Sequence, residues 1–319
     1  MKITFLDRAS FHENIQINSP NFVHEWHEFA NTKPEEIIEH CGNSQIIVTN
    51  KVPIDRKTLE SCPNIQHIAV TATGYNIIDI SACQDHGVSV SNIPNYASVT
   101  VPEHVLNMSL SLSRQLTLYQ QLVQQGKWQS STRFCLFDKP IYDLAGKTFG
   151  VIGLGSLGLA TGRLMHAIGM RVIYSSRSDK NVDFAEHVSL QYLLEESDVI
   201  SLHCALTDET SDLIGQAELN SMKNTAFLIN TARGGIANEQ AVYAAVQNGT
   251  IAGIGFDVLE QEPPSNDSSP LLSIAHYNNV LLTPHSAWSS QEAMQTLSDT
   301  VISNIEAFHQ GIEQNLVTA

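Results

Sequence analysis

Arg233, Glu262 and His285 are the side chains whose types together suit one specific reaction. Each follows a short apolar run that predicts a buried strand. An arginine holds a carboxylate through two parallel hydrogen bonds. A histidine exchanges a proton near neutral pH, and a carboxylate beside it orients the ring and favours its charged form. The set suits reduction of a 2-oxo acid, which needs an anchor for the carboxylate and a proton for the carbonyl oxygen.

Taken one at a time, each of these residues is more often a surface or helix-capping side chain. The functional interpretation needs all three at adjacent strand ends of one parallel sheet, because such sheets bind ligands beyond the carboxyl ends of their strands. It also needs a nicotinamide coenzyme beside them. The elements that would position the three residues therefore decide the prediction.

A glycine-rich turn is the evidence for the coenzyme. Residues 148–177 read as a strand, a glycine turn, a helix and a second strand, the context that a dinucleotide-binding fingerprint requires. Gly153 is expected to make the tight turn, Gly155 to let the backbone approach a pyrophosphate, and Gly158 to let helix and strand pack closely. The helix N-terminus offers free N–H groups to the phosphates. We therefore predict dinucleotide binding.

The end of the second strand of this unit indicates which coenzyme is bound. The fingerprint expects an acidic residue there, which bonds the ribose 2′-hydroxyl of NAD. This chain has Ser175 instead, followed by Ser176 and Arg177, which could bind a 2′-phosphate. The prediction is NADP(H). NAD(H) stays open, because Arg177 could instead be a solvated loop residue that stacks on adenine, and Asp179 lies close by.

Two series of alternating strands and helices surround these residues. In the first, apolar runs at residues 3–6, 46–48, 68–70 and 88–90 predict strands, and residues 34–41, 55–62 and 77–86 predict helices. The second series has six predicted strands, at residues 149–152, 172–174, 199–203, 226–230, 251–257 and 280–282. Such alternation indicates parallel sheets wound with helices. A long helix from Thr100 to Gln125 and a final helix over residues 291–309 complete the prediction.

The domain organisation follows from the position of the glycine turn. A complete dinucleotide domain in the middle of the chain splits the other domain. We expect a substrate domain formed by residues 1–98 and the return segment 287–319, a dinucleotide-binding domain at residues 99–286, and a cleft between the two. The predicted fold class is α/β, with two doubly wound parallel-sheet domains: a Rossmann coenzyme domain inserted in a split flavodoxin-like substrate domain.

Composition disfavours several other classes. The 319 residues carry a formal net charge of -16, which argues against nucleic acid and anionic membranes as partners. We also expect no membrane-spanning segment and no signal peptide. The five cysteines are scattered and lack metal-ligand spacing, so we expect reduced thiols, no metal site and a cytoplasmic location. His24 and His27, beside Trp26, predict a surface edge and not a metal site.

Along essentially its whole length the chain resembles the D-isomer-specific 2-hydroxyacid dehydrogenase family. The matching segments lie at residues 71–79, 99–104, 153–158, 202–207, 230–235, 257–258, 262–263 and 283–285. Within the family it is most similar to the bacterial glycerate dehydrogenase and hydroxypyruvate reductase group, through residues 126–128, 143–147 and 285–288. The resemblance implies NAD(P)H-dependent reduction of hydroxypyruvate or glyoxylate to D-glycerate or glycolate.

The resemblance also implies roles for individual residues. Arg233 would hold the substrate, His285 would be the acid/base, and Glu262 would be its partner. Backbone N–H groups at Thr73 and Gly74 would bind the substrate carboxylate. With the fingerprint residues, the expected coenzyme contacts are Thr100, Gly153, Gly155, Ser156, Leu157, Gly158, Ser175, Ser176, Arg177, His203, Cys204, Thr231, Ala232, Asp257 and His285.

Some features leave the substrate and the function class open. Pro102 stands where many members have alanine, Ser286 stands where many have isoleucine, and Trp288 would either line the substrate pocket or pack the hinge. A redox-sensing, NAD(H)-binding corepressor with weak activity is an alternative. So is a phosphite or formate dehydrogenase, although formate-type relatives carry glutamine where this chain keeps Glu262. The family generally dimerises through its coenzyme domains, so a homodimer is expected, with residues 134–138 reaching the neighbouring subunit.

Overall fold

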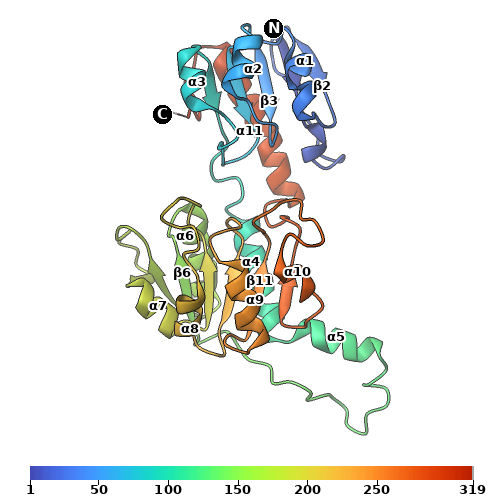
Figure 1. Ribbon diagram of the computed structural model, residues 1–319, viewed down its shortest axis with the longest axis vertical. Coiled ribbons are helices and arrows are strands. Elements are labelled where there is room, and N and C mark those ends of the chain that lie inside the picture. The colour runs from blue at the N-terminus through green and yellow to red at the C-terminus, as the bar shows by residue number, and fades with distance from the viewer. Residues whose placement is uncertain (318–319) are drawn as a thin grey trace. The chain divides into compact units, whose positions relative to one another are not determined.

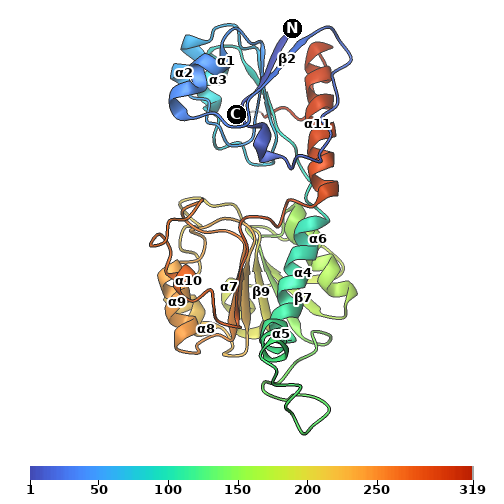
Figure 2. The ribbon, with the colours of Figure 1, turned by 90° about the vertical axis from the view of Figure 1, so that its right-hand side faces the viewer.

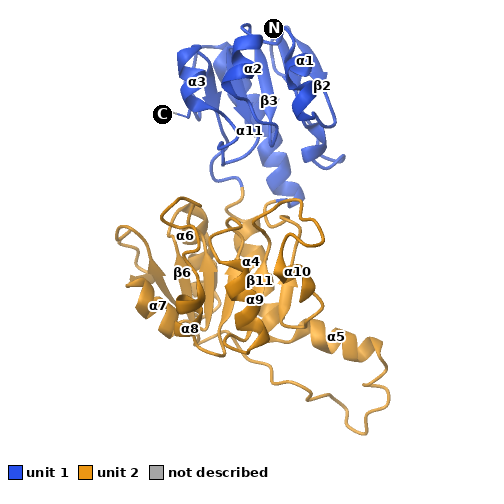
Figure 3. Ribbon diagram, viewed as in Figure 1, with its two compact units in different colours: residues 1–96, 289–319 blue, residues 97–288 orange. Residues whose placement is uncertain are grey.

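Two parallel sheets organise the chain in the computed structural model, which describes residues 1–317 (Figure 1). The chain divides into two compact units (Figure 3). Unit 1 contains residues 1–96 and the chain from Ser289 onward, and unit 2 contains Ala97–Trp288. Unit 2 is therefore continuous in sequence, whereas unit 1 is assembled from two separate segments.

Unit 1 is built on a five-stranded parallel sheet in the order β2-β1-β3-β4-β5, which is the flavodoxin-like order. Its strands are β1 (Lys2–Phe5), β2 (Glu25–Glu28), β3 (Ile46–Thr49), β4 (His67–Val70) and β5 (Ser89–Ser91). Helices α1 (Ile37–Cys41), α2 (Arg56–Ser61) and α3 (Ile80–Asp85) cover one face, and α11 (Gln291–His309) lies on the other (Figure 2). Phe308 of α11 stacks on the buried His67 of β4, with ring centroids 4.6 Å apart.

Unit 2 is built on a seven-stranded sheet in the order β12-β11-β10-β9-β6-β7-β8. From β6 onward this is the strand order 3-2-1-4-5-6 of dinucleotide-binding sheets, extended by one strand. The strands are β6 (Thr148–Ile152), β7 (Arg171–Ser175), β8 (Ala185–His187), β9 (Val199–Leu202), β10 (Phe227–Asn230), β11 (Gly253–Phe256) and β12 (Val280–Leu282). All pair in parallel, so their carboxyl ends share one edge. The predicted fold class is confirmed.

Helices cover both faces of this second sheet. On one face, α4 (Thr100–Ser113) packs against α6 (Ser156–Ala167), and Met108 of α4 lies over Gly255 of β11. The other face is covered by α7 (Leu190–Glu196), α8 (Gln216–Ser221), α9 (Glu239–Gln247) and α10 (Pro270–Ser273), whose apolar side chains form one core cluster with the strands. The glycine turn and the three candidate side chains are thus anchored on a continuous apolar core.

The predicted long helix from Thr100 to Gln125 is wrong. The chain instead forms α4, breaks at Gln115, which has a left-handed φ of 52°, and continues as α5 (Leu116–Gln124). Thr100 is the first residue of α4 and not its cap, since Val99 occupies the N-cap position. The hydroxyl of Thr100 donates instead to the carbonyl of Ala287, at 3.0 Å.

Within residues 1–317, no helix is both long enough and apolar enough to cross a membrane. The same residues contain no group of three or more His, Cys, Asp or Glu side chains arranged to hold a metal ion. All five cysteines are free thiols.

Candidate active site

The three glycines of the turn after β6 are required for three different reasons. Gly153 has φ +91°, and a Cβ on it would lie 2.7 Å from the backbone nitrogen of Cys204. A Cβ on Gly158 would lie 2.2 Å from the carbonyl oxygen of Gly153, so only glycine lets α6 approach the turn. A Cβ on Gly155 would meet nothing within 4 Å. Gly155 therefore leaves open space in front of the N-terminus of the twelve-residue α6, which fits an approaching pyrophosphate.

Ser175, Ser176 and Arg177 lie at the carboxyl end of β7, next to this turn. The carbonyl of Ser175 accepts from the backbone N–H of Gly153, at 2.9 Å. Arg177 is exposed. Asp179, the acidic residue of this loop, accepts from the hydroxyl of Tyr174 at 2.5 Å and from the N–H of Asn181 at 2.8 Å. The strand end therefore presents the hydroxyl of Ser175 and the guanidinium of Arg177. The hydroxyl of Ser176 donates to the carbonyl of Ser178 at 2.6 Å, and the carboxylate of Asp179 is bound within the loop.

Arg233 follows β10 in a loop that a buried asparagine braces. The side chain of Asn230 donates to the carbonyl of Arg233 at 2.9 Å and accepts from the N–H of Ala232 at 3.0 Å. Gly234 packs directly on the next loop, because a Cβ there would lie 2.0 Å from the carbonyl oxygen of Leu259. The Arg233 side chain is exposed and donates to the carbonyl of Ala232 at 2.7 Å. The guanidinium is thus presented to solvent from a rigid loop.

Thr231 in the same loop offers a second sign of a ligand. Its side-chain hydroxyl is buried and has no hydrogen-bond partner among the described residues. A buried hydroxyl without a partner is costly unless something else bonds it. Together with the open space at Gly155, this unpartnered hydroxyl fits a dinucleotide coenzyme at the carboxyl edge of unit 2.

His285 and Glu262 form a close pair at this edge. The Nδ1 atom of His285 lies 2.7 Å from Oε2 of Glu262, and the two side chains are 28% and 34% exposed. The other carboxylate oxygen of Glu262 accepts from the N–H of Leu259, at 3.0 Å. Because the carboxylate engages Nδ1, Nε2 is the ring nitrogen left to meet a substrate.

Asp257 holds the turn that carries His285. This buried residue accepts from the N–H of His285 through its main-chain carbonyl at 2.8 Å, while its side-chain oxygens accept from the N–H groups of Ser286 at 2.8 Å and Ala287 at 2.9 Å. These bonds stabilise the left-handed φ of 51° at His285, which is unfavourable for a residue with a Cβ. The turn geometry of the predicted acid/base is therefore set from the neighbouring strand β11.

Two residues to which the sequence assigned no individual role extend this network. The hydroxyl of Thr283 donates to Oδ1 of Asp257 at 2.5 Å and lies 3.1 Å from Nε2 of His104 on α4. Burial lowers the pKa of His104, and the nearby carboxylate of Asp257 opposes that shift. The signal for both was that they lie in segments that carry the family resemblance, residues 99–104 and 283–285.

His203 and Cys204 follow β9 and pack against the glycine turn. The N–H of His203 donates to the carbonyl of Ile152 at 2.8 Å, and its Nε2 lies 2.9 Å from the hydroxyl of Ser201. Desolvation lowers the pKa of His203 to about 4, so its ring is neutral at physiological pH. Both residues border the turn through their backbone.

The other predicted substrate residues are distributed over both units. Thr73 and Gly74 follow β4 in unit 1, where the carbonyl of Thr73 accepts from the side chain of Asn92 at 2.7 Å. Trp288 is the last residue of unit 2 and is half-buried. In unit 2 the structure brings together Arg233 after β10, Asp257 and Glu262 after β11, and His285 after β12, at the ends of three adjacent strands.

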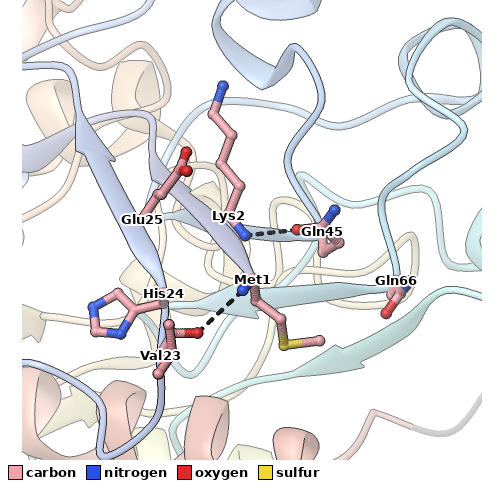
Figure 4. A pocket seen from close by; sticks show the side chains of 7 residues that line it. All are labelled: Met1, Lys2, Val23, His24, Glu25, Gln45 and Gln66. Atoms are coloured by element: carbon pink, nitrogen blue, oxygen red, sulfur yellow. Dashed lines mark hydrogen bonds between the residues drawn. The ribbon is translucent and has the colours of Figure 1, made fainter.

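A hollow of about 560 Å³ in unit 1 does not belong to this arrangement. Figure 4 shows it around Met1, Lys2, Val23, His24, Glu25, Gln45 and Gln66. Lys2 and Glu25 are the first residues of β1 and β2, so the hollow lies at the amino ends of the strands. Its drawn contacts are internal: the Met1 ammonium donates to the carbonyl of Val23, and the N–H of Lys2 donates to Gln45. Ligands of parallel sheets bind at the opposite edge.

Comparison with known proteins agrees with the site. Residues 106–287 match the family described as D-isomer specific 2-hydroxyacid dehydrogenase, NAD binding domain. The chain is 44% identical to a glycerate dehydrogenase of Methylorubrum extorquens over 319 residues, covering 100% of this chain and 99% of that protein. It is 36% identical to a hydroxypyruvate reductase of Blautia hydrogenotrophica, covering 90% and 88%. The structure of an acyclic imino acid reductase in complex with NADPH and D-Arg superposes with a TM-score of 0.84 at 27% identity, covering 100% of both chains.

Proposed function

Because the chain belongs to the D-isomer-specific 2-hydroxyacid dehydrogenase family, it is an oxidoreductase that uses a nicotinamide coenzyme to reduce small 2-oxo acids to D-2-hydroxy acids, and we propose hydroxypyruvate and glyoxylate as its substrates. The observation that carries the residue assignment is the contact between His285 and Glu262 at the strand edge that also carries Arg233 and the glycine turn. When bound, the reduced nicotinamide supplies a hydride to carbon 2 of the oxo acid.

The chain's own residues would handle the carboxylate and the proton. Arg233 holds the substrate carboxylate and carbonyl oxygen through its forked guanidinium. His285, protonated, donates from Nε2 to the carbonyl oxygen as the alcohol forms. Glu262 stabilises the positive ring by its charge and fixes the ring orientation through the bond to Nδ1.

Other residues would hold the coenzyme. Backbone N–H groups at Ser156 and Leu157, at the start of α6, bind the pyrophosphate in the space that Gly155 leaves. The hydroxyl of Thr231, which is buried without a partner in the described structure, bonds the nicotinamide end. Asp257 contributes there chiefly by fixing the turn at His285, since its side-chain oxygens already accept three hydrogen bonds.

We propose NADP(H) as the preferred coenzyme. Ser175 offers a hydroxyl and Arg177 an exposed guanidinium for a 2′-phosphate. Ser176, whose hydroxyl donates to the carbonyl of Ser178 at 2.6 Å, would exchange that bond for one to the phosphate. The position that would carry an acidic residue in an NAD-specific site holds Ser175. The carboxylate of Asp179 is bound to Tyr174 and Asn181, which supports the same preference.

We also propose a homodimer formed through an arm that consists of residues 116–143. The arm projects from the rest of unit 2 (Figure 1) and exposes aromatic side chains, with Phe134 90% and Phe137 72% exposed. Aromatic groups exposed on this scale are typical of interfaces. The five free cysteines support a reducing compartment such as the cytoplasm.

The test of this function is the oxidation of NADPH and of NADH by the purified protein, followed by absorbance, with hydroxypyruvate, glyoxylate and pyruvate. We expect rapid oxidation with hydroxypyruvate or glyoxylate, and a reduction in kcat of at least about a hundredfold for His285→Gln. His276→Gln, at an exposed histidine of the same unit, is the matched control and should retain full activity. Full activity of the His285→Gln enzyme would show that His285 is not the acid/base.

A further inference from the structure

A buried tyrosine holds the loop that follows β7 through hydrogen bonds. Tyr174 is fully buried, and its ring stacks on His187 of β8 with centroids 5.0 Å apart. Its hydroxyl donates to Oδ1 of Asp179 at 2.5 Å and accepts from the N–H of Lys180 at 2.9 Å. The same Asp179 oxygen accepts from the N–H of Asn181. One phenol therefore fixes both the side chain of Asp179 and the backbone beside it.

The hydrogen bond from Tyr174 places the carboxylate of Asp179 next to the Tyr174 side chain. Successive residues of a strand point to opposite faces, so Tyr174 and Ser175 point apart. Ser175 stands where an NAD-specific site has its ribose-binding carboxylate. Asp179, four residues later, is the first acidic side chain of the loop, and its carboxylate is bound to the side chain that points away from Ser175. The hydrogen bond from Tyr174 also lowers the pKa of Asp179, so the carboxylate is held ionised.

We propose that Tyr174 is a positioning residue for coenzyme selectivity: by binding Asp179 it keeps a negative charge away from the 2′-phosphate that Ser175, Ser176 and Arg177 bind. This proposal rests on the proposed NADP(H) preference. An unbound carboxylate in this short loop repels a 2′-phosphate and accepts a hydrogen bond from a 2′-hydroxyl. Release of Asp179 should therefore move the enzyme toward NADH.

The experiment measures binding of ADP-ribose and of its 2′-phosphorylated form to the purified protein by calorimetry, together with KM and kcat for NADPH and NADH. Tyr174→Phe keeps the ring and its stacking but removes the hydroxyl. We expect the Kd for the 2′-phosphorylated ligand to rise about tenfold while the Kd for ADP-ribose falls or stays the same, with kcat changed less than twofold. Tyr277→Phe, which removes a hydroxyl bonded to Gln247, is the matched control and should change neither Kd.

The double variant Tyr174→Phe/Asp179→Asn separates the charge from a loosened loop. If the released carboxylate is the cause, its removal restores the affinity for the 2′-phosphorylated ligand to within about threefold of wild type. If the loss persists in the double variant, or if Tyr174→Phe leaves both affinities unchanged, the proposal is overturned. Asp179→Glu retains the charge on a longer side chain outside the core and should also lower the preference for the 2′-phosphorylated ligand over ADP-ribose. It replaces Tyr174→Phe if that variant is unstable.

The wild-type protein tests the underlying coenzyme preference separately. A wild-type preference for ADP-ribose over its 2′-phosphorylated form would contradict the proposed use of NADP(H). The change that Tyr174→Phe causes in the ratio of the two Kd values, for ADP-ribose and for its 2′-phosphorylated form, would still support or overturn the role of the tyrosine.

Discussion

At the scale of single residues, two carboxylates at the carboxyl edge of unit 2 have different tasks. Glu262 contacts the imidazole of His285, whereas Asp257 is buried and binds the backbone of the turn that carries it. The sequence predicted both acids, because they follow the strand β11. It could not predict the network through Thr283 to His104, because both lie in matching segments but their hydrogen bond joins residues 179 positions apart.

Replacement of Glu262 by glutamine tests the charge beside the acid/base. The amide oxygen can still accept from the N–H of Leu259, but the NH2 group then faces Nδ1 of His285 and cannot accept the proton of the positive ring. We expect kcat for reduction to fall about ten- to a hundredfold while the Kd for the coenzyme is unchanged. Steady-state kinetics and fluorescence titration measure the two quantities. Glu260→Gln, two positions away, should leave both unchanged, and equal losses in the two variants would contradict the assignment.

A buried histidine in unit 1 makes stability depend on pH. His67 lies between the hydroxyls of Ser89 and Ser91, and desolvation lowers its pKa from 6.5 to about 4. As the pH falls, His67 therefore binds a proton near pH 6.5 in the unfolded chain but only near pH 4 in the folded chain. The neutral ring's contribution is complete above pH 6.5 and is lost as the pH falls toward 4.

The test compares urea unfolding of the wild type and of His67→Gln at neutral pH and near pH 4.5. We expect the free energy of unfolding of the wild type to fall by about 2 kcal/mol more than that of the variant. His203, which has a similarly low pKa, is present in both proteins and cancels in the comparison. Parallel losses in the two proteins would exclude His67 as the source.

At the scale of elements, the sequence predicted the central strands and one edge strand of each sheet, and it missed the other edge strand of each. The strands β2, with sequence EWHE, and β8, with sequence AEH, were not predicted, and each ends one of the sheets. These two edge strands are largely solvated and carry no apolar run, so a pattern that depends on burial does not detect them. The break between α4 and α5 at Gln115 was not predicted because no glycine or proline lies there in the sequence. The final helix, in contrast, occupies the predicted residues 291–309 because its apolar face repeats regularly.

The glycine turn gives a prediction in which two similar substitutions have opposite consequences. Gly158→Ala places a Cβ 2.2 Å from the carbonyl oxygen of Gly153, so we expect the free energy of unfolding to fall by about 2 kcal/mol. Gly155→Ala meets no protein atom within 4 Å, so stability should change by less than about 0.5 kcal/mol. The same methyl group enters the proposed pyrophosphate space and should raise the Kd for the coenzyme at least about tenfold.

Chemical denaturation and coenzyme titration of the two variants measure these effects. Undiminished coenzyme binding by Gly155→Ala would show that the pyrophosphate lies elsewhere. A stable Gly158→Ala protein would show that α6 can shift away from the turn.

At the scale of the whole molecule, the arm of residues 116–143 exposes aromatic side chains that no described part of the single chain covers. Its side chains Trp128, Phe134 and Phe137 surround a hollow of about 760 Å³. We expect Phe134→Glu/Phe137→Glu to shift the protein from dimer to monomer, because two charges would have to be buried at the proposed interface. Sedimentation equilibrium measures the mass. Val23→Glu, at a position in unit 1 that is 94% exposed, is the matched control and should remain dimeric.

The assembly of unit 1 from two segments has a consequence for how the protein is made. Residues 97–288 form unit 2 without interruption, so this unit can fold on the ribosome while the rest of the chain is still being synthesised. The first 96 residues cannot complete their core at that stage. One face of their sheet needs α11, which brings Phe308 onto His67 and Asn304 to the carbonyl of Asn92. Residues 1–96 therefore leave the ribosome before unit 2 but become native after it, and their unfinished sheet face is what a chaperone would have to shield until α11 is synthesised.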